Sequence, residues 1–213
     1  AASYTTIQAD VNTAISVVVS YTDDLGGVES PVSASTAAVV NVNDLPTGNV
    51  TITGIPTEDQ ILTADPSGLA DADGLGVFSY QWQRNGVDIT GENGNTLTLG
   101  DADAGAVNRV WVSYTDGFGA LESVVSGDTP AIANVNDPGV ASIDNTTPSQ
   151  GDILTASVSD IDGTTTSIFS YQWRRDGIDI AGATAASYTT IQADVNTAIS
   201  VAVSYTDDLG GVE

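Results

Sequence analysis

The chain has 213 residues, room for one large domain or two small ones, and its 28 acidic and 4 basic residues give a net charge of −24. So few bases make nucleic acid and an anionic membrane surface poor partners, and no apolar run approaches the ~20 residues of a membrane-spanning helix. Cysteine and histidine are absent, which removes thiol nucleophiles, zinc sites and Ser-His-Asp triads, and methionine is absent, which favours a processed chain or a window from a longer one.

Short apolar runs bounded by turn residues predict strands throughout and no sustained helix. Phe78, Tyr80 and Trp82 alternate with polar residues, which is the period of a half-buried strand. The pair Asn85-Gly86 follows and predicts a two-residue hairpin, because both residues accept positive φ at low cost. In chain order, the predicted strands cover residues 17–21, 50–53, 61–64, 78–83, 96–99, 110–114, 121–125, 131–135, 169–173 and 201–205.

The sequence repeats itself at an interval of 91–93 residues. Residues 1–29 recur at 185–213 with one change, and a more diverged copy lies between them. The run Asn-Val-Asn-Asp occurs at 41–44 and again at 134–137. Fixed-period self-similarity is typical of tandem arrays of folded units.

The phase of the repeat sets the expected domain boundaries. If Asn-Val-Asn-Asp ends a unit, residues 1–44 are the C-terminal half of one repeat. Residues 45–137 are then a complete repeat, and residues 138–213 are a third repeat that lacks its last strand. Because half a unit exposes its core, this phase favours a window cut from a longer array.

Three copies of one strand distinguish its two faces. One face carries Val, Val and Tyr in every copy, at 17, 19 and 21, at 110, 112 and 114, and at 201, 203 and 205. We expect this face in the core. On the other face Trp111 stands where the other copies have Val18 and Ala202, which predicts an exposed indole that contacts a neighbouring strand, chain or ligand. Partial burial under a loop is the alternative.

About seven strands per unit predict an all-β fold of tandem antiparallel Greek-key β-sandwiches arranged end to end. Trp82 stands where immunoglobulin-type sandwiches bury a tryptophan, and Asp103-Ala104-Gly105 resembles the Asp-x-Gly corner of that fold. Together with SYQWRRDGIDIAGAT, YTT, SYTDDLGG and NVNDLPTG, these features resemble the immunoglobulin-like or cadherin-like tandem repeats of large bacterial surface proteins, including calcium-dependent repeat adhesins. The resemblance implies an extracellular, cell-surface location and a structural or adhesive role.

The resemblance also implies calcium sites at the linkers between repeats. Cadherin-type junctions combine an acidic pair, an Asx-rich linker and a downstream Asp-x-Asp, all oxygen donors that calcium prefers. The matching residues are Asp10, Asn41, Asn43, Asp44, Asp71 and Asp73 at the first linker, and Asp101, Asp103, Asn134, Asn136, Asp137, Asp160 and Asp162 at the second. Gln8 and Gln192 replace Asp101 in the other copies, and Glu58 has no clear acidic counterpart in the third repeat. Ordinary turn chemistry of Asp and Asn is the alternative explanation.

These features predict a structural extender segment of an extracellular adhesin or fibre, non-catalytic, with neighbouring repeats of the same chain as its partners. Acid pairs on the turns of a repeating scaffold give no single special cluster for an active site, so we expect no enzyme activity. Two alternatives remain: a self-assembling filament or sheath subunit that pairs with other copies through sheet edges, and a glycan- or protein-binding adhesive module with Trp111 as its anchor.

Overall fold

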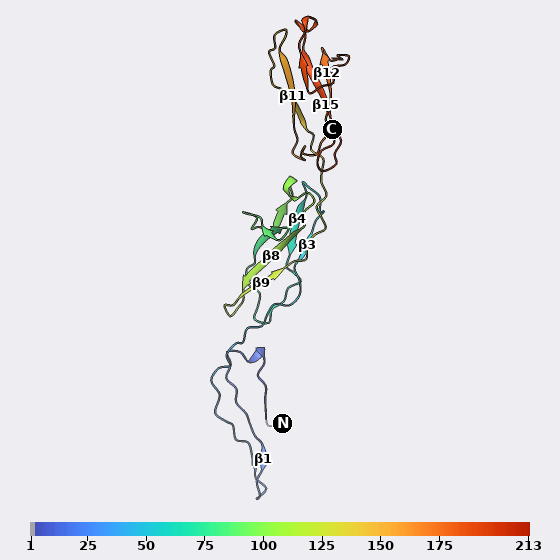
Figure 1. Cartoon of the computed structure of the whole chain (residues 1–213). Helices are drawn as coiled ribbons and strands as arrows, with labels where there is room; N and C mark the ends of the chain where they lie inside the picture. Colours follow the sequence, from blue (N-terminus) through green and yellow to red (C-terminus); the bar gives the residue numbers. More distant parts are fainter. Residues whose placement is uncertain (1–2) are drawn as a thin grey trace. The chain divides into compact units, whose positions relative to one another are not determined.

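The computed structural model describes residues 3–213, which form short strands and three 3-10 helices (Figure 1). The chain forms two compact units. The first unit comprises the described residues up to Pro56, together with Gln60–Thr98 and Ala106–Ala131. The second unit comprises Thr57–Asp59, Leu99–Gly105 and Ile132–Glu213.

Two antiparallel sheets make up most of the first unit. One sheet has the order β3-β4-β7, and the other has the order β6-β5-β8-β9. Their strands are β3 (Thr51–Thr53), β4 (Ile61–Asp65), β5 (Ser79–Arg84), β6 (Val87–Asp88), β7 (Thr96–Thr98), β8 (Asn108–Thr115) and β9 (Leu121–Val125). This strand order confirms the predicted Greek-key sandwich, with consecutive hairpin strands in one sheet and crossovers to the other.

The sequence pattern accounts for this sandwich. Alternate residues of β8 are buried, and Val110 and Val112 have no exposed surface, so the invariant face is core as predicted. Trp82 is also fully buried, and its indole N–H donates to the Gly94 carbonyl over 3.0 Å. Asn85 has a φ of 49°, which confirms the hairpin after β5.

The second unit contains a matching pair of sheets, ordered β10-β11-β14 and β13-β12-β15. Their strands are β10 (Val140–Ile143), β11 (Ile153–Ser159), β12 (Ser170–Arg175), β13 (Ile178–Asp179), β14 (Ser187–Thr189) and β15 (Ile199–Ser204). In Figure 1, β11 lies alongside the β12–β15 pair. Leu154 and Trp173 form the centre of this core.

Three sequence predictions differ from the structure. The strand predicted over residues 17–21 is present only as an isolated bridge from Val18 to Val32 and as Tyr21, which begins the two-residue strand β1. Residues 131–135 form only isolated bridges, from Ile132 to Ala104 and from Ala133 to Thr57, and no regular strand. Val17 and Val19 are more than half exposed, whereas the equivalent β8 residues are buried. The strands that cover the equivalent face of β8 have no counterpart within residues 3–44, where the named strands are β1 (Tyr21–Thr22) and β2 (Val28–Glu29).

The three 3-10 helices, η1 (Gln8–Asp10), η2 (Asp101–Asp103) and η3 (Gln192–Asp194), share one capping device. In each, the last aspartate accepts the backbone N–H of the residue that precedes the helix. This bond satisfies an N–H that the short helix leaves unpaired. Along residues 3–213, no helix is long and apolar enough to cross a membrane.

Candidate metal centre

An Asp-x-Asp turn forms the base of each linker site. In the second unit, Asp160 accepts the Asp162 N–H over 2.9 Å and also the Tyr205 hydroxyl. In the first unit, Asp71 makes the same two bonds, with the Asp73 N–H at 2.8 Å and with the Tyr114 hydroxyl at 2.5 Å. The second aspartate of each turn is thereby held in a buried position, with Asp162 3% exposed and Asp73 4% exposed.

The Asn-Val-Asn-Asp linker is bound directly to this turn. The Asp137 N–H donates to Asp162 Oδ2 over 3.0 Å, and the Asn134 side-chain amide lies 3.3 Å from the same oxygen. The Asn136 amide donates to Glu213 Oε1 over 2.6 Å. The first linker repeats the pattern, because the Asp44 N–H donates to Asp73 and the Asn43 amide donates to Glu122. The structure therefore brings together the linker and Asp-x-Asp residues that the sequence singled out, separately at each linker.

Three carboxylates converge at each of two places in the second unit. Oxygens of Glu58, Asp101 and Asp137 all lie within 4.8 Å of one another, as do oxygens of Asp160, Asp207 and Glu213. Arg174 and Arg175 form ion pairs with Asp179 and Asp194, which belong to neither group. Such groupings repel unless a cation or protons neutralise them.

Buried oxygens without donors mark the same region. Glu58 Oε1, Asn134 Oδ1, Asp162 Oδ1 and Asp207 Oδ2 are buried and have no hydrogen-bond partner among the described residues. Glu58, Asp162 and Asp207 are each at least 95% buried. A buried polar atom left unpaired costs about 1–3 kcal/mol, so these oxygens call for a cation or for water.

Gly211 belongs to the same arrangement. A Cβ at this position would lie 1.4 Å from Asn136 Oδ1 and 2.2 Å from Asp207 Oδ2. Glycine therefore lets an amide oxygen and a carboxylate oxygen approach the same point. Carboxylate and amide oxygens are the donor set of hard cations, and the residues present fit calcium.

The electrostatics of the two linker sites differ. At the second linker, burial and the neighbouring charges of Asp101 and Asp162 raise the pKa of Asp137. The pKa of Glu58 is also raised, since burial and Asp101 outweigh the bond from the Val135 N–H. At the first linker, the Asp44 N–H and the amides of Asn41 and Gln8 lower the pKa of Asp73 despite its burial.

Two predicted ligands have other partners. Asp103 caps η2 through the Gly100 N–H, and Asp10 accepts the Ile7 N–H and the Tyr4 hydroxyl. Neither carboxylate belongs to the two three-carboxylate groups found among the described residues. Their equivalent in the third repeat, Asp194, is ion-paired to Arg175.

Sequence reasoning left three acids out of the site. They are Glu58, which has no clear acidic counterpart in the third repeat, and Asp207 and Glu213. The available signal was their recurrence: Asp116 and Glu122 occupy the same positions one repeat earlier, and all four of these last acids are buried or partly buried.

Trp111 is the exposed aromatic that the sequence predicted. It lies on β8 between Gln81 of β5 and Val125 of β9, and it is 39% exposed. Val125 beside it is equally exposed. The predicted contact of this indole with a partner stays a prediction.

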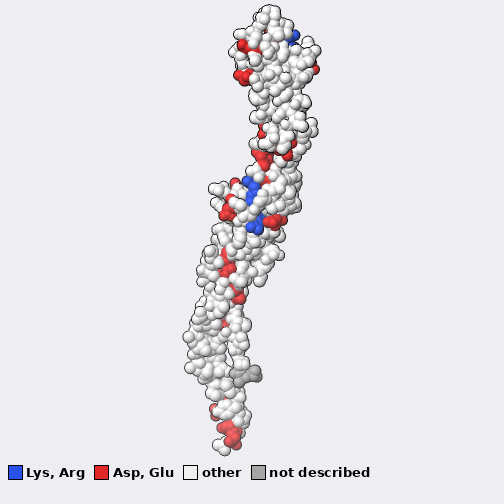
Figure 2. Space-filling model, in the orientation of Figure 1, with Lys and Arg blue, Asp and Glu red and all other residues white. Residues whose placement is uncertain are grey.

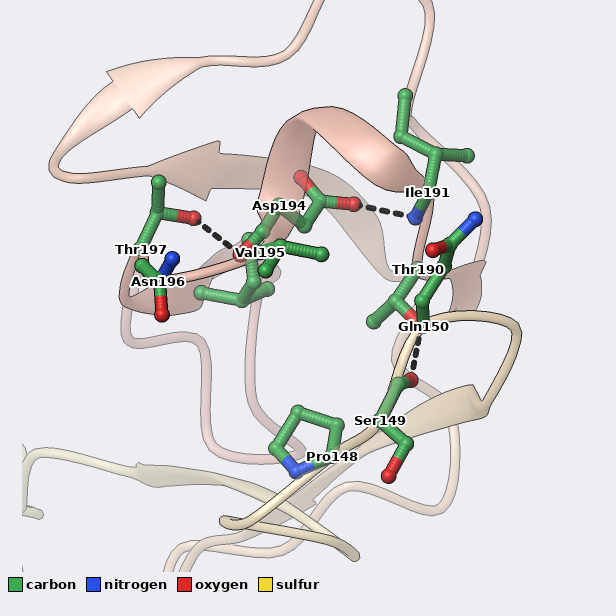
Figure 3. A pocket seen from close by; sticks show the side chains of 10 residues that line it. Pro148, Ser149, Gln150, Thr190, Ile191, Asp194, Val195, Asn196 and Thr197 are labelled. Carbon is green, nitrogen blue, oxygen red and sulfur yellow. Dashed lines mark hydrogen bonds between the residues drawn. The ribbon is translucent and has the colours of Figure 1, made fainter.

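A cavity of about 410 Å³ lies in the third repeat, between the turn at Ser149 and η3 (Figure 3). Its one carboxylate, Asp194, accepts the Ile191 N–H and is paired to Arg175. In the middle repeat, Ile132 lies at the equivalent place, where it bridges Ala104. The cavity thus corresponds to the place that the segment around Ile132 occupies in the middle repeat, and its one carboxylate is already paired.

Comparison with solved structures gives eleven matching chains. A solved structure described as a Ca2+-stabilized adhesin that helps an Antarctic bacterium reach out and bind ice aligns with 94% of this chain at 14% identity and a TM-score of 0.35. The chain spans about half, 54%, of that structure's length. No family model and no curated protein matches the chain.

Proposed function

We propose that this chain is a structural extender segment of an extracellular tandem-repeat adhesin or fibre, with calcium bound at the second linker. The observation that carries the proposal is the set of buried, unpaired oxygens beside the two three-carboxylate groups. Asn134 belongs to the Asn-Val-Asn-Asp linker, and Asp162 accepts the N–H of the linker residue Asp137.

Calcium is the cation that suits the donors. The chain offers no cysteine or histidine, and the site supplies carboxylate and amide oxygens. Calcium takes six to eight such ligands in irregular geometry, whereas magnesium requires a near-octahedral shell and keeps several waters. Glu58, Asp101 and Asp137 would hold one ion, and Asn134, Asp162 and Asp207 offer the remaining unpaired oxygens.

Charge balance and repetition support a structural role. Figure 2 shows acidic side chains gathered in patches, with largely uncharged surface between them. Divalent ions would neutralise part of the net charge of −24 at the linkers, where carboxylates crowd most closely. Residues 1–29 and 185–213 are nearly identical, which is typical of a segment selected for the number of its repeats. We infer that the chain has no catalytic role.

The test is to titrate the 213-residue chain with calcium. Isothermal calorimetry measures the binding, and thermal unfolding measures the change in Tm. With a Kd near 0.1 mM and 10 mM calcium, mass action adds about 2.7 kcal/mol, which is ~10 °C or more in Tm for a domain of this size. Chelator should reverse the gain. Glu58→Gln should reduce it, and Asp24→Asn, which removes an exposed acid elsewhere, should leave it intact. An unchanged melting curve would refute calcium binding.

A binding module is the second candidate, favoured by the exposed pair Trp111 and Val125 on one sheet face. A glycan array or partner screen should then give a saturable signal that Trp111→Ser abolishes. Absence of any such signal, with a monomeric chain in solution, favours the extender.

A further inference from the structure

The two linker sites differ at one position of η1 and η2. Gln8 and Asp101 both begin a three-residue 3-10 helix, and they are equivalent in the 93-residue offset between these copies. The same offset relates Asn41 to Asn134. Asp73 and Asp162 are equivalent because each accepts the N–H of the linker's final aspartate.

The side-chain amide of Gln8 satisfies the oxygens that are unpaired at the second linker. Gln8 Nε2 donates to Asp73 Oδ1 over 2.7 Å and lies 3.4 Å from Asn41 Oδ1. Their equivalents, Asp162 Oδ1 and Asn134 Oδ1, are both buried without a partner. The amide thus stands between the two oxygens that a cation would otherwise bridge.

The arrangement of the carboxylates also differs between the first and the second linker. Both three-carboxylate groups in residues 3–213 lie at the second linker. At the first linker, Asp71, Asp116 and Glu122 are equivalent to Asp160, Asp207 and Glu213 but do not converge in this way. One unpaired oxygen remains there, Asp116 Oδ2, which corresponds to Asp207 Oδ2.

We propose that Gln8 is a built-in substitute for the cation, so that one residue at the start of the 3-10 helix decides whether a linker depends on calcium. An amide NH2 carries partial positive charge and two donors, and it pairs with an oxygen that a carboxylate at the same position would repel. This inference rests on the proposed calcium site at the second linker for its contrast, but the hydrogen bonds of Gln8 stand without it.

The third repeat has glutamine at two positions where the middle repeat has an acid. Gln192 begins η3, as Gln8 begins η1. The Gly151 N–H donates to Thr190, as the Asp59 N–H donates to Leu99, and so Gln150 stands at the position of Glu58. The linker that this repeat would supply therefore lacks two of the acids found at the second linker.

The test exchanges the two residue types in the full chain. Gln8→Glu is isosteric and sets a carboxylate against Asp73, and Asp101→Gln introduces the amide at the second linker. Gln60→Glu, at an exposed site, is the matched control for charge. Calcium binding is measured by calorimetry, and the responding linker is assigned from the amide NMR signals of Asp44 and Asp137.

In the wild-type chain, calcium should shift Asp137 but not Asp44. Gln8→Glu should lower Tm without calcium and add a response at Asp44. Asp101→Gln should raise Tm without calcium and weaken binding at Asp137 by about an order of magnitude or more, because affinity depends on the number of charged ligands.

Outcomes separate this inference from the proposed function. Equal calcium responses at Asp44 and Asp137 in the wild-type chain would overturn the inference and leave the calcium proposal standing. A wild-type chain that binds no calcium would overturn the proposed function, and the calcium-free melting temperatures would then decide the inference alone. Unchanged calcium-free Tm values in both Gln8→Glu and Gln8→Ala would overturn it.

Discussion

Replacing Trp173 by alanine should strongly destabilise the third repeat and leave the stability of the middle one unchanged. Trp173 is fully buried, stacks on Tyr188 with ring centroids 5.6 Å apart, and donates its indole N–H to the Ala185 carbonyl over 2.9 Å. Truncating a buried tryptophan costs about 3–5 kcal/mol. The Ala185 carbonyl also loses its hydrogen bond, which adds ~1 kcal/mol. A repeat of about 75 residues is stable by roughly 4–11 kcal/mol, so the change removes about half of its stability or more.

The remaining indoles make the assay specific. Trp82 and Trp111 lie on β5 and β8 of the first unit, so tryptophan fluorescence of Trp173→Ala reports that sandwich alone during urea unfolding. The amide NMR signals of residues 138–213 report the variant repeat. Trp111→Ala, at a 39% exposed position, is the control and should cost less than about 1.5 kcal/mol.

A shift of the fluorescence transition equal to that of the third-repeat signals would refute independent folding of the repeats. A loss below about 2 kcal/mol would refute the assignment of Trp173 as the centre of its core.

Three further predictions concern the linkers and loops. Gly211→Ala should reduce the free energy of calcium binding by more than the free energy of unfolding of the calcium-free chain, because the new Cβ displaces Asn136 Oδ1. Calorimetry measures the binding, and an undiminished calcium affinity would contradict the prediction. The Thr165 and Thr166 hydroxyls and N–H groups lower the pKa of Asp208 below its unfolded value of about 3.9, so its stabilisation is present above that pH and is lost as pH falls. Asp208→Asn should therefore destabilise the chain at neutral pH and by progressively less as pH falls below ~4, as measured by urea unfolding, and a loss that does not change with pH would refute it. A peptide with the sequence of residues 30–44 should bind the open groove of the third repeat and raise its Tm, and a scrambled peptide should not; no binding would argue against the predicted domain boundaries.

The sheets were predictable because their determinants are local. Alternation in β5, the Asn85-Gly86 turn and the invariant face of β8 each depend on neighbours in the sequence. The segment 131–135 reads as a strand but makes only isolated bridges, because its backbone is shared between the η2 corner and the turn at Glu58. The local pattern of apolar residues does not show which distant segments a backbone will pair with.

The site was only partly predictable because it joins distant segments. The linker and Asp-x-Asp residues were visible as motifs, but Glu58 lies 79 residues before Asp137 and reaches it only through the fold. In the sequence, Gln8 is a departure from the acidic pattern and by itself indicates only a lost ligand. Its role as a donor depends on the position of Asp73, 65 residues away, which no spacing rule supplies.

Glutamine and aspartate alternate along the chain at the position that begins each 3-10 helix. Gln8 and Gln192 flank Asp101, and the copies that contain the glutamines are nearly identical while the middle copy differs. Duplication of a two-repeat block would propagate this alternation along a longer chain. Under the proposed role of Gln8, each block would contain one linker of the glutamine type and one that binds a cation, and removal of calcium should affect only the second type. Under the proposal, this difference between linkers follows from a single side chain, because Gln8 Nε2 donates to Asp73 Oδ1 and lies 3.4 Å from Asn41 Oδ1, whose equivalents at the second linker are unpaired.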